Sequence, residues 1–177
     1  MIARNDYLQK LINRMNYGMI KVVSGIKKCG KSYLLFDIFY NYLLQNGADK
    51  EHIISLQLED RMNIRYRDSD FLCEYVHSKI VDEKNYFILL DEVQYVNEFE
   101  DVLISFLHIK NADVYVTGSN AKFLSSDIIT EFRGRGDQIH LSPLSFKEYF
   151  DYCKLDLEDA LNECSSCVFN GKRGNNS

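Results

Sequence analysis

Residues 25–32 read Gly25-Ile26-Lys27-Lys28-Cys29-Gly30-Lys31-Ser32. They match the pattern G-x-x-x-x-G-K-[ST] at every fixed position, and all eight are candidate phosphate-binding residues. The two glycines let the backbone fold back on itself, so that successive N–H groups point at one phosphate. Lys31 is long enough to reach the β- and γ-phosphates, and the Ser32 hydroxyl suits magnesium. The stretch therefore predicts a loop that binds the phosphates of a nucleoside triphosphate.

The residues on either side of this loop support the prediction. Residues 19–24 are short and rich in β-branched side chains, which is typical of a strand. Residues 31–45 have the length of a helix and are apolar nearly all round, so we expect this helix to be buried against a sheet. Its dipole adds positive charge at the phosphates. Because the backbone binds phosphate in such loops, Lys27 and Lys28 are expected to face solvent, and Cys29 is interpreted as a small filler.

A second signal is the apolar stretch Phe87-Ile88-Leu89-Leu90, which ends in Asp91 and Glu92. An apolar strand that ends in an acid holds magnesium in sites of this kind, so Asp91 is expected to bind Mg²⁺ together with Ser32. Glu92 follows at once and is placed to orient or deprotonate an attacking water. The alternative is that this acidic pair caps a helix starting near Asn97.

A third signal follows the fourth predicted strand, in Val116-Thr117-Gly118-Ser119-Asn120. A polar side chain at this position can contact the γ-phosphate or the attacking water from the neighbouring strand. Asn120 is the candidate catalytic residue, with Ser119 beside it. The alternative is that either one is the N-cap of the next helix.

A fourth signal is Arg133-Gly134-Arg135-Gly136, just before the fifth predicted strand. An arginine here can stabilise transition-state charge, either in its own subunit or across an interface. The alternative is a turn with solvated arginines. At the other end of the chain, Arg4 and Tyr7 are hypothesised to reach the adenine from the N-terminal helix.

Strand and helix patterns alternate along the chain. We expect strands at 19–24, 52–58, 86–90, 114–117 and 138–141, and helices at 6–17, 31–45, 68–80, 99–107 and 121–132. In the 68–80 helix, Phe71 is expected to face inward with the other apolar residues. Ser145 and Glu148 have capping-box spacing for a further helix. This alternation predicts an α/β fold with a parallel sheet covered on both faces, in which ligands bind beyond the carboxyl ends of the strands.

The composition narrows the classes of protein. The 177 residues suit one domain, and the longest apolar run is far below the roughly 20 residues of a membrane span. The N-terminus lacks the apolar core of a signal peptide, and five cysteines favour reduced thiols, so a cytoplasmic location without membrane contact is expected. The net charge of −5 argues against a dedicated nucleic-acid binder.

Five stretches of the chain resemble, in their order and spacing, the motifs of one prokaryotic family of AAA-superfamily ATPases. Longer members of this family carry an uncharacterised C-terminal domain. The five stretches are VVSGIKKCGKSYLL, FILLDEVQ, VYVTGSNAKFLSS, the GR of FRGRGDQIHL, and PLSFKEYF. The resemblance covers about residues 4–160. The first two stretches hold the Walker A and Walker B motifs, which all P-loop enzymes share. VTGSN and PLSFKEYF are more specific to the family.

This resemblance implies a P-loop NTPase three-layer sandwich with a five-stranded parallel sheet in the order 5-1-4-3-2. It also implies that Glu92 is the catalytic base and that Arg135 is an arginine finger. We expect residues 1–18 to form an N-terminal helix packed on the core, 19–160 an AAA-type ATPase domain, and 161–177 a polar, disordered tail. Members of the family continue into a second domain, so the short C-terminus indicates truncation.

The leading functional hypothesis is Mg²⁺-dependent ATP hydrolysis, coupled to a conformational change in a partner protein or a neighbouring subunit. The acids at 91–92, and the lack of an N-K-x-D guanine-reading sequence, favour ATP over GTP. The alternative is a non-catalytic nucleotide-binding switch or a truncated ATPase fragment. Association with DNA is a third idea, which arginine clusters suggest and the net charge does not support.

Overall fold

The computed structural model describes residues 4–119, 123, 132, 134–145 and 148. The chain divides into two compact units, Arg4–Pro143 and a second unit made of Met1–Ala3 with Leu144–Ser177. In the second unit, Ser145 and Glu148 form the reciprocal bonds of a capping box: the Ser145 N–H donates to Glu148 Oε2 (2.8 Å), and the Glu148 N–H donates to Ser145 Oγ (3.2 Å). The predicted helix at 121–132 and the domain boundary at residue 160 lie outside the described residues.

A five-stranded sheet forms the centre of the Arg4–Pro143 unit. Its strands are β1 (Ile20–Ser24), β2 (Ile53–Gln57), β3 (Tyr86–Asp91), β4 (Ala112–Gly118) and β5 (Gly136–His140). Every adjacent pair is parallel, and the order is β2-β3-β4-β1-β5. This is the predicted order 5-1-4-3-2 read from the other edge, so both the parallel sheet and its order are confirmed.

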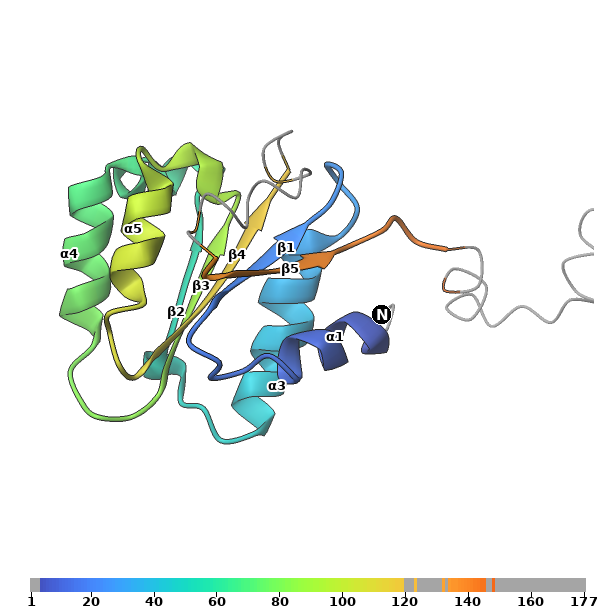
Figure 1. Ribbon diagram of the computed structural model, residues 1–177, viewed down its shortest axis with the longest axis horizontal. Coiled ribbons are helices and arrows are strands. Elements are labelled where there is room, and N and C mark those ends of the chain that lie inside the picture. The colour runs from blue at the N-terminus through green and yellow to red at the C-terminus, as the bar shows by residue number, and fades with distance from the viewer. Residues whose placement is uncertain (1–3, 120–122, 124–131, 133, 146–147, 149–177) are drawn as a thin grey trace, which may run out of the picture. The chain divides into compact units, whose positions relative to one another are not determined.

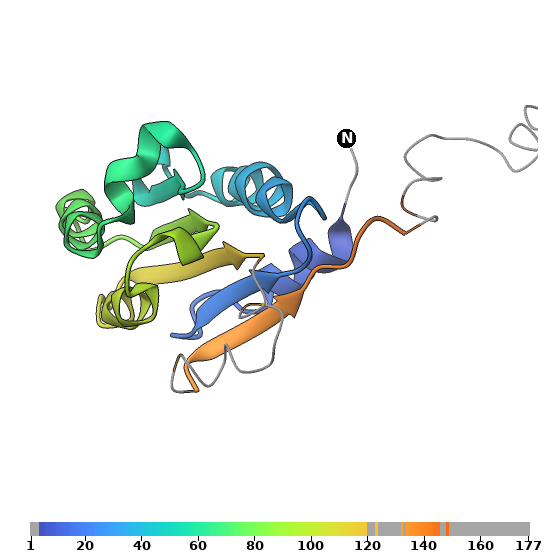
Figure 2. The ribbon, with the colours of Figure 1, turned by 90° about the horizontal axis from the view of Figure 1, so that it is seen from above.

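Helices cover both faces of this sheet (Figures 1 and 2). On one face, α4 (Ser69–Lys79) and α5 (Phe99–Phe106) pack on the buried residues of β3 and β4. On the other face lie α1 (Asn5–Ile12) and a continuous helical stretch after β1. That stretch contains α2 (Lys31–Tyr33), a π-helix η1 (Leu34–Phe39) and α3 (Tyr40–Gln45). The predicted three-layer sandwich is therefore confirmed.

Three short 3₁₀ helices complete the described elements: η2 (Lys50–His52), η3 (Arg61–Arg67) and η4 (Val93–Tyr95). The sequence reading missed η3. Its N-cap Asp60 accepts a 2.9 Å hydrogen bond from the Met62 N–H. Arg67 at its end donates to the carbonyl oxygens of Leu58 (2.8 Å) and Glu59 (3.0 Å), which fastens this helix to the end of β2.

Two sequence expectations differ from the structure. The first helix ends at Ile12 rather than at residue 17. Residues 13–16 form turns, and Asn16 adopts a φ of 61°, outside the helical region, where its N–H donates to the buried carboxylate of Asp113 at 3.0 Å. Phe71 was expected to face inward but is 39% exposed. It lies in the first turn of α4, and the guanidinium of Arg65 lies over its ring. Within the described residues, no helix is long and apolar enough to cross a membrane.

Candidate nucleotide-binding site

The loop at 25–32 leaves the carboxyl end of β1 and enters α2, and its backbone shape depends on its two glycines. Gly25 has a φ of 154°, and a Cβ there would lie 2.4 Å from the Leu141 carbonyl oxygen. Gly30 has a φ of 99°, in the left-handed region that favours glycine. The loop therefore has the tight turn that the sequence pattern predicts, placed against the strand end after β5.

Arg4 supports this loop from behind. The side chain is buried, and it donates to the Cys29 carbonyl oxygen (3.0 Å) and to the Ser142 carbonyl oxygen (2.8 Å). These two bonds join the loop to the segment that follows β5. The structure thus gives Arg4 a supporting role beneath the loop, which differs from the contact with adenine expected from the sequence.

Lys31 is buried with its ammonium turned toward the loop. Its Nζ donates to the carbonyl oxygens of Gly25 and Ile26, both at 3.2 Å, and lies 3.6 Å from Glu92 Oε1. The other two lysines of the loop are exposed, as expected. Lys27 forms an ion pair with Glu59 at 3.1 Å, and this partner raises the pKa of the Lys27 ammonium.

Asp91 ends β3 beside this loop, and its carboxylate is buried. Thr117 Oγ1 donates a hydrogen bond to Asp91 Oδ1, and the Ser32 hydroxyl also interacts with the carboxylate. Burial raises the pKa of Asp91, and these two interactions act in the opposite direction. A hydroxyl and a carboxylate oxygen in contact are the hard donors that Mg²⁺ prefers, so the residues present fit that ion.

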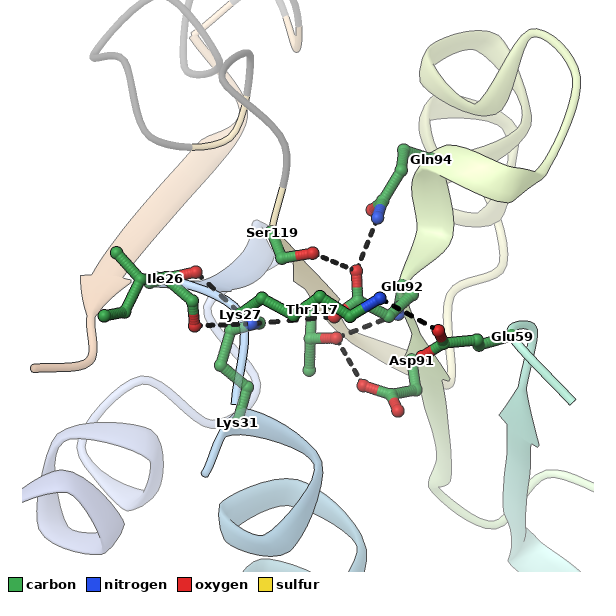
Figure 3. A network of polar contacts seen from close by, with 10 residues as sticks. Ile26, Lys27, Lys31, Glu59, Asp91, Glu92, Gln94, Thr117 and Ser119 are labelled. Atoms are coloured by element: carbon green, nitrogen blue, oxygen red, sulfur yellow. Dashed lines mark hydrogen bonds and ion pairs between the residues drawn. The ribbon is translucent and has the colours of Figure 1, made fainter. Parts of the chain in front are cut away.

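Glu92 follows in a left-handed conformation, with φ 51° and ψ 51°. Its N–H donates to Thr117 Oγ1 at 2.9 Å. Its carboxylate accepts hydrogen bonds at Oε2 from Ser119 Oγ (2.6 Å) and from Gln94 Nε2. Figure 3 shows these side chains converging on Glu92 from β4 and from η4, with Lys31 approaching from the loop. A carboxylate held at this position suits the orientation or deprotonation of a water.

Two residues of this network were not predicted. Thr117 was read only as part of a strand, although its hydroxyl contacts both Asp91 and Glu92. Gln94 was not singled out at all. Its position two residues after Glu92 carries no chemical signal, because only the 3₁₀ turn of η4 directs it back to that carboxylate.

The remaining predicted residues lie elsewhere. Arg135 is exposed and precedes β5, next to the first residue of β1, because its carbonyl oxygen accepts from the Ile20 N–H at 2.8 Å. The five residues of β1 separate it from the loop by roughly 17 Å. The structure therefore does not bring Arg135 to the phosphate loop of its own chain. Asn120 and Arg133 lie outside the described residues.

A family model described as an AAA domain matches residues 17–150. An uncharacterized protein of Haemophilus influenzae is 36% identical over 163 residues, which are 91% of this chain and 40% of that protein. An uncharacterized protein of Methanocaldococcus jannaschii is 33% identical over 141 residues, which are 78% of this chain and 30% of that protein. The chain thus spans less than half the length of these relatives.

Among solved structures, a DNA polymerase III gamma subunit-related protein from Thermotoga maritima has a TM-score of 0.58. The match covers 89% of this chain and 52% of that chain, with 10% sequence identity. At this identity the likeness concerns the fold alone. It agrees with the parallel sheet and the strand order described above.

Proposed function

This chain belongs to the AAA domain family, and we propose that it binds ATP with Mg²⁺ and hydrolyses it. The observation that carries the proposal is the convergence of three buried charged residues beside the loop at 25–32. Lys31 comes from α2, Asp91 ends β3 and Glu92 follows it as the N-cap of η4, and all three are at most 6% exposed. Burial of charges is costly, so their retention together favours a functional site over a structural one.

The phosphates bind through the loop backbone and Lys31. The ammonium of Lys31, bonded here to two loop carbonyls, transfers to the β- and γ-phosphate oxygens when the nucleotide binds. The N–H groups at the start of α2 add the positive end of a helix. Because the sequence lacks a guanine-reading N-K-x-D stretch, we infer that the base is adenine.

Ser32 and Asp91 hold the metal ion in this proposal. When bound, magnesium neutralises the charge that develops on the β- and γ-phosphate oxygens. Asp91 must be ionised to act as a ligand, and the interactions with Thr117 and Ser32 favour that form against the effect of burial.

Glu92 acts as the general base toward the attacking water. The hydrogen bond from its N–H to Thr117 fixes its backbone, and its carboxylate lies 3.6 Å from the ammonium of Lys31, at the end of the phosphate loop. The released energy drives a conformational change in a further part of the protein, in a partner or in a neighbouring subunit. Relatives more than twice as long as this chain support a second, coupled part.

One observation favours a second candidate, a nucleotide-binding switch with negligible turnover. Glu92 Oε1 faces the ammonium of Lys31 at 3.6 Å. If this ion pair persists when ATP binds, the charge of Glu92 stays neutralised and the protein binds nucleotide without hydrolysing it.

Phosphate release separates the two candidates. The wild-type protein and Glu92→Gln are incubated with ATP and Mg²⁺, and nucleotide binding is measured on both. We expect both to bind and only the wild type to release phosphate. Equal phosphate release by the two proteins would remove Glu92 from catalysis, and binding without release by the wild type would support the switch.

A further inference from the structure

The two oxygens of the Glu92 carboxylate have different surroundings. Oε2 accepts hydrogen bonds from the hydroxyl of Ser119 at 2.6 Å and from the amide of Gln94. Oε1 faces the ammonium of Lys31 at 3.6 Å. In the described part of the chain, no other donor to this carboxylate is found. One oxygen is therefore anchored by neutral donors, and the other faces the ammonium of Lys31, a cation that the phosphates attract in the proposed complex.

A count of lone pairs shows what this asymmetry does. Each carboxylate oxygen accepts two hydrogen bonds, so Ser119 and Gln94 together fill Oε2. Oε1 also has two acceptor positions, and the ammonium of Lys31 at 3.6 Å takes at most one of them, so Oε1 can accept a hydrogen bond from a water. When the ammonium moves to the phosphates, both positions become available to water.

Gln94 is held in place by its backbone. It lies in η4, where the Tyr95 N–H donates to the Glu92 carbonyl oxygen (3.1 Å) and the Val96 N–H donates to the Val93 carbonyl oxygen (2.9 Å). The orientation of the amide is also fixed, because a rotated amide would point its oxygen at the carboxylate. The amide oxygen is buried and has no hydrogen-bond partner among the described residues. Burying an amide whose oxygen has no partner costs free energy. The presence of such an amide here favours a functional role for its donor side.

We propose that Gln94 is a positioning residue, which together with Ser119 anchors Glu92 through Oε2 and thereby makes Oε1 the atom that accepts the proton. This inference rests on the proposed hydrolysis of ATP. In the step, Oε1 takes a proton from water as the water oxygen forms its bond to the γ-phosphorus. The bond from that phosphorus to the bridging oxygen breaks, and its electron pair leaves with ADP.

The test compares the steady-state kinetics of Gln94→Ala with those of a variant that loses a glutamine side chain far from the site. Gln9→Ala on α1 is the control, because Gln9 donates a 2.8 Å side-chain hydrogen bond at the exposed surface. For Gln94→Ala we expect kcat to fall by about tenfold or more while KM changes by less than about twofold, because a misplaced base affects chemistry and not binding. Gln9→Ala should match the wild type in both constants.

Two further variants separate positioning from folding. Gln94→Glu keeps the size of the side chain but replaces the donor by an acceptor, so it should lose at least as much kcat as Gln94→Ala. Ser119→Thr keeps the hydroxyl and should retain more activity than Ser119→Ala. Melting temperatures and ATP affinities near those of the wild type show that each protein is folded.

A double-mutant comparison tests whether Gln94 acts through Glu92. In a Glu92→Gln background, Gln94→Ala should cause no further loss, because the carboxylate it positions is gone. The inference is overturned if Gln94→Ala or Gln94→Glu keeps the kcat of Gln9→Ala, or if the losses of Gln94→Ala and Glu92→Gln multiply. Such results leave ATP hydrolysis intact. A wild type that releases no phosphate instead overturns the proposed function, and this inference with it.

Discussion

Thr117 accepts a 2.9 Å hydrogen bond from the N–H of Glu92, and the same hydroxyl donates to the carboxylate of Asp91. Thr117 is fully buried on β4, the strand that pairs with β3 on the side toward the phosphate loop. A single side chain thus fixes both the proposed metal ligand and the backbone of the proposed base. Its hydroxyl also supports the left-handed conformation of Glu92, a strained one for a residue with a side chain.

Thr117→Val should lower both stability and activity. The substitution keeps the shape of the side chain but leaves the Glu92 N–H buried without an acceptor, which costs about 1–3 kcal/mol. Urea unfolding measures the loss in the free energy of unfolding, and phosphate release measures the effect on the base. Thr117→Ser keeps the hydroxyl and should recover most of both. An unaltered free energy of unfolding in Thr117→Val would show that these hydrogen bonds contribute nothing.

Asp91→Asn should make the protein more stable and inactive at neutral pH. The pKa of Asp91 is raised by burial, so the ionised carboxylate destabilises the folded state, and a neutral amide removes that penalty. The amide is a poor magnesium ligand, so Mg²⁺-dependent phosphate release should be lost. A variant that is inactive and also less stable than the wild type would contradict this account.

The stability gain of Asp91→Asn should depend on pH in a stated direction. With a pKa raised above the ordinary value of 3.8, the folded state binds the proton more tightly than the unfolded state. The wild type therefore gains stability relative to Asp91→Asn as the pH falls toward that value. Urea unfolding of both proteins between neutral and acidic pH should show the difference narrowing on acidification. A difference that widens would reverse the sign of the pKa shift.

A buried ion pair near the amino ends of β1 and β4, at the opposite end of these strands from the phosphate loop, is expected to affect stability and not activity. Lys21 is fully buried and pairs with Asp113, which also accepts a 2.7 Å hydrogen bond from the Tyr115 hydroxyl. Lys21→Met leaves the Asp113 charge buried without its cation, which costs about 3–5 kcal/mol. Adding Asp113→Asn should restore part of this loss. Calorimetric unfolding measures both variants, and a double variant no more stable than Lys21→Met would contradict the pairing.

An action of Arg135 on ATP is predicted only across an interface, on the nucleotide of a neighbouring subunit. Because Arg135 lies at the amino end of β5, opposite the end of β1 that enters the phosphate loop, Arg135→Ala should keep the Mg-ATP affinity within about twofold of the wild type. If it serves a neighbouring subunit, mixing Arg135→Ala with Glu92→Gln restores phosphate release, since each supplies what the other lacks. A mixture with no more release than the separate proteins would exclude an arginine finger at this position.

The fold was predictable because its signals are local. The central strand β3 is a continuous apolar run, and the alternation of strand and helix patterns is enough to predict a parallel sheet. The strand order came from the resemblance to a family and is confirmed by the pairing of β1 with both β4 and β5. Phe71 shows the limit of periodicity: its spacing matches the inward face of α4, but its ring contacts Arg65 and Tyr66 of η3 and stays 39% exposed.

The polar network was less predictable because it depends on register and turns. The sequence identified Lys31, Asp91 and Glu92 from their motifs, and the structure brings them together. Thr117 contributes only because β4 pairs with β3 so that its hydroxyl meets the end of that strand. Arg4 contacts the loop from 25 residues away in sequence, and no spacing rule connects the two. Such contacts emerge only from the three-dimensional arrangement.

Binding of Mg-ATP to Glu92→Gln, with and without Lys31→Ala, tests the central claim most directly. The Glu92→Gln background prevents hydrolysis and avoids leaving an unpaired buried carboxylate when the lysine is removed. Titration calorimetry should show one site in Glu92→Gln, and Lys31→Ala should weaken it by about tenfold or more, because a charge-assisted hydrogen bond contributes about 1.5–3 kcal/mol. Equal affinity in the two proteins, or no binding to either, would contradict the assignment of residues 25–32 as the phosphate loop.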